Sequence, residues 1–164
     1  MSATGRKITI RDAHDDDGEA LIALIEKCWA DYPGCILDVD GENAELRCFA
    51  SHYTDRGGRA WIAENAGKVV GSAAVEPASG GAHIQTLYVD PALRRQGLAR
   101  RLVALVEVAA RKFGAEVIDL WTDTRFTEAH GFYESLGYRR KPGTRRLDDA
   151  SRSVEYNYVK RLEA

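Results

Sequence analysis

The sequence predicts a mixed α/β fold in one domain, and three observations support this. The chain has 164 residues, of which 45% are hydrophobic. This is enough for one core and too little for two ordinary domains. Apolar residues alternate in some stretches and recur every three or four residues in others, which indicates strands and helices. The resulting order is strand, two helices, three strands, helix, strand, helix, two strands, which is typical of a mixed sheet covered by helices.

The first third of the chain predicts one strand and two helices. Residues 8–11 (ITIR) form a short apolar run, and Asp16 and Glu19 then have the spacing of a helix capping box. A helical stripe follows at Leu21, Leu24, Ile25, Cys28, Trp29 and Tyr32. Pro33 and Gly34 end that helix, and 35–43 reads as a loop. A second helix is predicted from the spacing of Leu46, Phe49, Ala50 and Tyr53.

The middle of the chain predicts three strands. Residues 59–64 and 68–75 flank a turn at 65–67, which indicates a β-hairpin. A second turn at 77–81 leads into a strand over 82–89.

The third of these strands has an irregular pattern. In a regular strand, Ile84 and Leu87 would point to opposite faces. One extra residue between them would place both on the same face, so we predict a β-bulge there.

The second half predicts two more helices and three strands. The apolar stripe of 98–113 is the longest in the chain, and Gly114 follows it as a C-terminal cap. Thr127 is expected to cap a short helix that ends at Leu136. The predicted strands are 117–121, a strand from Tyr138 continuing toward Leu147, and 154–159.

Composition excludes several classes of function. No apolar run approaches the roughly 20 residues of a membrane span, and residues 1–7 lack the apolar stretch of a signal peptide. A net charge of -2 argues against a nucleic-acid partner. Three cysteines without a CxxC pair suit a reducing compartment, so we expect a cytoplasmic protein. The four histidines have no metal-ligand spacing, so no metal is expected.

One segment carries a chemical signal. The strand ending at Val89 runs through a short loop into the long helix, and Gly97 stands at the helix start. Free N–H groups and the positive end of the helix dipole meet there. Four basic residues surround the turn: Arg94, Arg95, Arg100 and Arg101. This arrangement predicts a phosphate or pyrophosphate cradle. Neither GxxxxGK[ST] nor GxGxxG occurs, so the usual nucleotide motifs do not explain it.

Two motifs together resemble the GNAT superfamily of N-acetyltransferases. The run Arg94-x-x-Gly97-x-Ala99 after a strand resembles the family's acyl-CoA loop, written Q/R-x-x-G-x-G/A, and residues 129–138 (AHGFYESLGY) resemble its later helix and strand. The resemblance implies one acyl-CoA N-acyltransferase domain over residues 5–162. Its central sheet is expected to be mostly antiparallel, with a splay between strands four and five and helices on both faces.

The resemblance also implies a cofactor site and a proton donor. Acetyl-CoA is the expected co-substrate, held along the fourth strand and at the helix start. Its expected contacts are Leu87, Tyr88, Val89, Arg94, Arg95, Gln96, Gly97, Leu98, Ala99 and Arg100. Tyr133 is expected to protonate the departing thiolate. Many members carry an asparagine seven residues before this tyrosine. Phe126 stands there instead, with Arg125 and Thr127 as neighbours that could replace its contact.

The remaining roles are less sharply indicated. An amine needs a base to remove its proton, and Glu76, Asp123 and His83 are candidates, with water as the alternative. In the family, the first two helices, their loop and the last hairpin shape the acceptor pocket. This implies Trp29 and Tyr32 on one side, with the loop 33–40, and Arg145, Arg146 and Asp148 on the other.

The sequence therefore predicts an acetyl-CoA-dependent N-acetyltransferase that transfers an acetyl group to the primary amine of a small molecule. Transfer is expected to be direct, within a ternary complex. Acetylation of a protein N-terminus or lysine is the alternative within the same chemistry. A non-catalytic CoA-binding module is the alternative outside it. Dimers are common in the family, so a homodimer is an open expectation.

Overall fold

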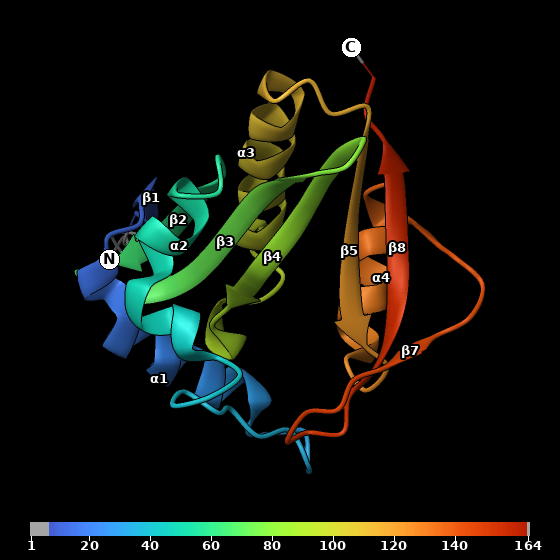
Figure 1. Ribbon diagram of the computed structural model, residues 1–164. Coiled ribbons are helices and arrows are strands. Elements are labelled where there is room, and N and C mark those ends of the chain that lie inside the picture. Colours follow the sequence, from blue (N-terminus) through green and yellow to red (C-terminus); the bar gives the residue numbers. More distant parts are fainter. Residues whose placement is uncertain (1–6, 164) are drawn as a thin grey trace.

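The computed structural model describes residues 7–163, and their strands form one mixed sheet (Figure 1). Residues 5 and 6 of the predicted domain lie outside this range. The sheet order is β1-β2-β3-β4-β5-β8-β6, and β7 pairs with β8. The strands are β1 (Thr9–Asp12), β2 (Arg59–Asn65), β3 (Lys68–Ala78), β4 (Gly81–Val89), β5 (Val117–Asp123), β6 (Arg139–Arg140), β7 (Arg145–Arg146) and β8 (Val154–Arg161). Every pair is antiparallel except β4 with β5, which confirms the mostly antiparallel sheet that the resemblance implied.

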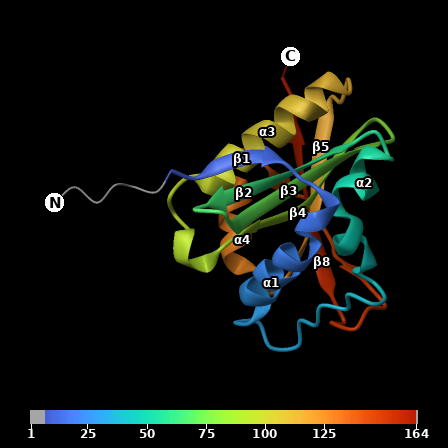
Figure 2. The same cartoon turned by 90° about the vertical axis from the view of Figure 1, so that its left-hand side faces the viewer.

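Helices cover both faces of the sheet, which confirms the predicted layers (Figure 2). The α-helices are α1 (Gly18–Trp29), α2 (Phe49–Thr54), α3 (Leu98–Lys112) and α4 (Thr127–Ser135). Short 3₁₀ turns are η1 (Asp15–Asp17), η2 (Ala44–Cys48) and η3 (Pro91–Leu93). One apolar core lies under α3 and α4, and a second lies under α1 and α2. No helix in the described part of the chain is long and apolar enough to cross a membrane.

The long helix α3 forms because its apolar stripe fits the sheet. Leu102, Val103 and Val106 are buried against it, and this burial dominates the stability of such a helix. The helix begins after Gly97, which has a φ of 81° and is its N-cap. Packing of α3 therefore fixes where the Gly97 turn lies relative to β4.

The predicted capping box at Asp16 and Glu19 is wrong. The Asp17 carboxylate instead accepts the His14 backbone N–H at 2.7 Å, and Arg11 pairs with it at 2.7 Å. The extra turn η1 therefore precedes α1 and takes over the capping interaction. The first helix also ends at Trp29, so Tyr32 lies in the following loop.

Other boundaries also differ from the predictions. Thr127 is the first residue of α4 and not its cap, and Phe126 occupies the N-cap position without a side-chain bond. The second helix is split into η2 and α2, and β3 continues through Pro77. The strand predicted from Tyr138 toward Leu147 is broken into β6 and β7, because the Pro142-Gly143 turn interrupts it.

The predicted bulge in β4 is present. Gln85 lies opposite Ala74 and Tyr88 lies opposite Ser72, so β4 carries one extra residue there. Ile84 and Leu87 accordingly pack on the α3 side, while Tyr88 packs on the α1 side. The bulge turns the last residues of β4 relative to its first half.

The strands β4 and β5 separate after a short paired stretch, which confirms the predicted splay. Only residues 81–83 pair with residues 117–119. Beyond them β5 stays paired with β8, while β4 stays paired with β3 (Figure 1). The edge of β4 that faces β5 is consequently free of strand partners over residues 84–89.

Two buried hydroxyl groups hold the bulge. Thr86 has a φ of 53°, a conformation that is costly for a β-branched residue. The Ser72 hydroxyl donates to the Thr86 carbonyl at 2.7 Å, and the Tyr53 hydroxyl hydrogen-bonds the Thr86 hydroxyl at 3.2 Å. Ser72 and Tyr53 are both buried. These contacts offset the backbone strain and fix the direction in which β4 leaves β5.

Replacing Ser72 with alanine is expected to lower the free energy of unfolding by about 1–3 kcal/mol, because the Thr86 carbonyl loses a buried donor. Urea unfolding of the variant measures this loss. Ser135→Ala is the control, since its exposed hydroxyl only bonds Phe132 within its own helix. Equal losses in the two variants would contradict the role given to Ser72.

Candidate functional site

Two cavities meet where β4 and β5 separate. The first, of about 610 Å³, lies among the end of β4, the start of α3 and α4. The second, of about 290 Å³, lies among β4, β5 and the segments 35–45 and 147–155. Both are lined by Trp29, Leu87, Tyr88, Phe126, Ala129 and Tyr133. The shared wall means that molecules in the two cavities would approach each other at the splay.

The turn before α3 forms an anion-binding concavity. Arg95 and Gly97 both have left-handed backbone conformations, with φ of 65° and 81°. No backbone N–H from Arg95 to Arg100 donates to a backbone carbonyl within residues 7–163. Free N–H groups in such a turn, together with the helix dipole, suit a phosphate group. A Cβ built on Gly97 meets no atom within 4 Å, so this side of the turn is open.

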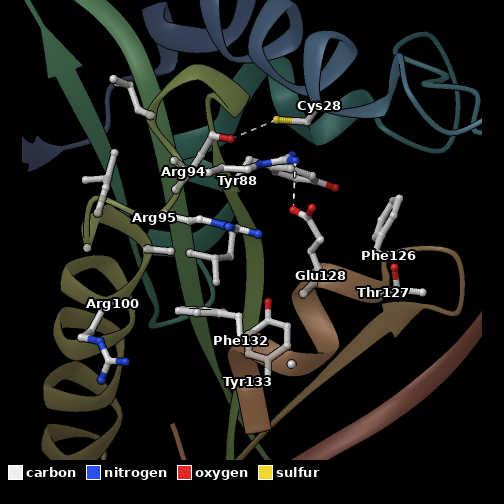
Figure 3. A pocket seen from close by; sticks show the side chains of 18 of the residues that line it. Cys28, Tyr88, Arg94, Arg95, Arg100, Phe126, Thr127, Glu128, Phe132 and Tyr133 are labelled. Atoms are coloured by element: carbon white, nitrogen blue, oxygen red, sulfur yellow. Dashed lines mark hydrogen bonds and ion pairs between the residues drawn. The ribbon is translucent and has the colours of Figure 1, made fainter. Parts of the chain in front are cut away.

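The basic residues predicted around this turn divide into two groups. Arg94, Arg95 and Arg100 line the first cavity, and Arg94 pairs with Glu128 of α4 at 3.5 Å across it (Figure 3). Arg101 points elsewhere, because its guanidinium donates to the Ile8 carbonyl at 3.4 Å. Three of the four arginines therefore add positive charge to the cavity.

The structure brings together nearly all residues predicted to bind the cofactor. All ten line the first cavity except Gln96, which is exposed and lines neither cavity. Gln96 lies within the turn, so only its backbone N–H shares in the concavity. The edge of β4 over Leu87–Val89 is free on its β5 side, which leaves backbone groups for an extended ligand. The Cys28 thiol donates to the Val89 carbonyl at 3.4 Å.

Tyr133 stands at the junction of the two cavities. Its side chain comes from α4, is only 7% exposed, and its hydroxyl points into the first cavity (Figure 3). Burial raises the pKa of Tyr133 well above its usual value. The hydroxyl therefore keeps its proton at neutral pH, which a proton donor requires.

An aromatic cluster closes the junction from the side of α1. The Phe126 ring lies 4.8 Å from that of Tyr32 and 6.4 Å from that of Trp29. Trp29 lines both cavities, whereas Tyr32 lines the first and not the second. Of the neighbours of Phe126, Thr127 lines the first cavity and Arg125 lines neither. Position 126 therefore supplies an apolar wall where a polar side chain was expected from the resemblance.

Asp123 lines the second cavity, and both oxygens of its carboxylate accept hydrogen bonds from Arg125. Arg125 donates to it from its backbone N–H at 2.8 Å and from its guanidinium at 2.8 and 2.7 Å. Burial of Asp123 opposes ionisation, but the hydrogen bonds from Arg125 outweigh it and lower the pKa of this carboxyl. A carboxylate with a lowered pKa is a weak proton acceptor.

The other two base candidates lie outside both cavities. Glu76 accepts a hydrogen bond from Gln85 at 3.2 Å, and Gln85 lines the second cavity. Glu76 is thus one side chain away from that cavity. His83 pairs with Asp119 at the last paired position of β4 and β5 before the splay, and it lines neither cavity.

The second cavity contains many residues that sequence reasoning missed. Leu147 and Asp149 line it, whereas the expected Arg145, Arg146 and Asp148 do not. The unpredicted polar and aromatic lining residues are Asn43, Glu45, Gln85, Thr86, Trp121, Thr122, Asp149, Ser151, Ser153 and Glu155. The sequence offered one indication of these residues: some of them, such as Thr122 and Glu155, lie near strand ends.

Comparisons with known proteins agree with this geometry. The model of the acetyltransferase (GNAT) family matches residues 19–138. The chain is 33% identical over 144 residues to the uncharacterized N-acetyltransferase YjgM of Escherichia coli, covering 84% of this chain and 83% of that protein. It spans about half the length of the mammalian relatives that it matches.

Solved structures share the fold. A GNAT-family acetyltransferase of Staphylococcus aureus superposes with a TM-score of 0.81 at 21% identity, covering 96% of this chain and 100% of that one. The PaiA N-acetyltransferase of Thermoplasma acidophilum, solved in complex with coenzyme A, superposes with a TM-score of 0.70 at 16% identity, covering 94% and 99%. No group of three or more potential metal ligands occurs within residues 7–163.

Proposed function

The chain belongs to the acetyltransferase (GNAT) family, and on this premise we propose that it transfers the acetyl group of acetyl-CoA to the primary amine of a small molecule, directly and within a ternary complex. The observation that carries the proposal is the meeting of a phosphate-cradling cavity with a second, smaller cavity at the β4–β5 splay. The volume of the second cavity, about 290 Å³, is at the low end for small-molecule sites and favours a small acceptor over a long peptide.

The residues of the first cavity fit acetyl-CoA. The N–H groups of residues 95–100, which donate to no backbone carbonyl within residues 7–163, and the side chains of Arg94, Arg95 and Arg100 would hold its phosphates. The free β4 edge at Leu87–Val89 would align its extended arm. When bound, acetyl-CoA supplies a thioester whose C–S bond breaks as the amine nitrogen forms the new C–N bond. Orientation of the two partners at the splay supplies much of the rate.

Protons must leave the amine and reach the sulfur. Tyr133 is proposed as the donor to the departing thiolate, since it is protonated and lines both cavities. Glu76 is proposed as the base over Asp123, because Arg125 lowers the pKa of Asp123 and occupies its oxygens. Gln85 separates Glu76 from the acceptor cavity, so the proton would cross this gap through water.

Three free cysteines are consistent with the proposed cytoplasmic location.

Acetyl-CoA is expected to raise the melting temperature of the protein by roughly 5–10 °C at a hundredfold excess over Kd. Gly97→Glu is expected to remove most of this shift through charge repulsion at the phosphate cradle. Gly114→Glu is the matched control, because Gly114 has the same φ of 81° and lies at the other end of α3. Differential scanning fluorimetry measures both. An unchanged shift in Gly97→Glu would remove the cradle from the proposal.

Tyr133→Phe is expected to lower kcat about 100-fold, because the departing thiolate loses its proton donor. The KM for acetyl-CoA should stay the same, since the ring that lines the cavity is retained. Thiol release in the steady state measures both constants. Tyr138→Phe removes a neighbouring buried hydroxyl that meets no hydrogen-bond criterion within residues 7–163, and its kcat should match that of the wild type. Similar kcat values for the two variants would exclude Tyr133 as the acid.

Glu76→Gln and Asp123→Asn are expected to have different effects. Glu76→Gln should lower kcat/KM for the acceptor about 100-fold and keep the acetyl-CoA thermal shift. Asp123→Asn should mainly lower the free energy of unfolding, by about 2 kcal/mol, since Arg125 loses its partner. This stabilisation is present above the usual Asp pKa of 3.8 and disappears as pH falls through the lower folded value. A larger kinetic loss in Asp123→Asn would make Asp123 the base.

A further inference from the structure

The cavity assigned to the acceptor is negatively charged. Four carboxylates line it, from Glu45, Asp123, Asp149 and Glu155, and no lysine, arginine or histidine is among its lining residues. A charged ligand in this cavity would therefore meet acidic groups on several sides. The sign of this field restricts which amines can bind there.

Two of these carboxylates are already neutralised by neighbouring arginines. Asp123 pairs with Arg125 at 2.7 Å, and Glu155 pairs with Arg145 at 2.8 Å. Arg145 also lies 4.0 Å from the centre of the Trp121 ring, so its position is held from two sides. Each of these two cations pairs with one carboxylate, so the other two lining carboxylates have no arginine in an ion pair with them.

The other two carboxylates, Glu45 and Asp149, form no ion pair within residues 7–163. The Asp149 oxygens accept the backbone N–H and hydroxyl of Ser153 at 2.7 and 2.6 Å, which are neutral donors. Glu45 takes part in no ion pair within the described range of residues. Glu45 is half-buried and belongs to η2. This turn lies between α1 and α2 and forms part of the cavity wall.

Aromatic rings supply the remaining recognition surface. Five aromatic residues line the cavity, namely Trp29, Tyr88, Trp121, Phe126 and Tyr133, and Arg145 already lies over the Trp121 ring. Ring faces attract organic cations, and the attraction adds to that of nearby carboxylates. An acceptor with a carboxylate or phosphonate group would instead bring an anion into a cavity with no cation in its lining. Such a ligand would lose its hydration without gaining a partner.

From this arrangement we infer that the acceptor is a small diamine or short polyamine, with one nitrogen at the splay beside Tyr133 and a second, positively charged nitrogen received by Glu45. The inference rests on the proposed acetyltransferase function and adds the charge of the acceptor to it. The nitrogen at the splay must lose its proton before attack. The distal nitrogen keeps its proton throughout, because its role is to bind and orient the acceptor.

A panel of matched acceptors tests the inference by steady-state thiol release. The probes are 1,4-diaminobutane, 1-aminobutane, 4-aminobutanoate and 3-aminopropylphosphonate. The wild-type kcat/KM for the diamine should exceed that for the monoamine about tenfold, the scale of one charge-assisted contact, and exceed both anionic amines by more. Glu45→Gln should reduce the ratio of diamine to monoamine toward one. Glu26→Gln, on the exposed face of α1 and outside both cavities, should keep the ratio.

The outcomes separate the two proposals. Equal kcat/KM for diamine and monoamine, or preference for an anionic amine, would overturn the inference and leave acetyl transfer in place. An unchanged ratio in Glu45→Gln would also overturn the assignment of Glu45. Thiol release with none of the four amines would overturn the diamine inference, and thermal stabilisation by acetyl-CoA would then report separately whether the cofactor half of the proposed function stands.

Discussion

The site depends on one backbone constraint, the bulge at Thr86. A regular β4 could continue alongside β5, and its edge over residues 84–89 would then be paired with that strand. The extra residue and the left-handed φ of Thr86 turn β4 away, so that pairing with β5 stops after residues 81–83. Both cavities follow from this departure, since each is bounded by the last residues of β4. The strained backbone of Thr86 thus lies at the point where the sheet opens, and the buried hydroxyl groups of Ser72 and Tyr53 stabilise it.

The lining of the first cavity could be predicted because most of it is local in sequence. The end of β4, the turn and the start of α3 occupy one continuous stretch, and the arginines and glycine that matter are neighbours there. The irregular apolar pattern at Ile84 and Leu87 even indicated the bulge. The family resemblance pointed to Tyr133. The resemblance did not reveal that Tyr133 belongs to the wall that the two cavities share.

The lining of the second cavity could not be predicted in the same way. Its lining comes from segments far apart in the chain, including η2, β4, β5 and the loop before β8. Which of their side chains face inward depends on strand register and loop docking. Ser151 illustrates this, because its hydroxyl bonds the backbone of Ile36 at 2.7 and 3.1 Å and joins two loops 115 residues apart. The predicted caps of α1 and α4 were wrong for a related reason. Arg11 binds the Asp17 carboxylate before α1, and Arg125 binds the Asp123 carboxylate before α4.

The division of the lining between one continuous stretch and several loops has an evolutionary consequence. Substitutions in the segments around Glu45 and Asp149 can change the second cavity without touching the turn before α3. Residues of the shared wall have no such freedom, since a change at Tyr88 or Phe126 alters both cavities at once. New acceptor specificities should therefore arise by drift in the outer loops, while the shared wall changes slowly and holds the two halves in register.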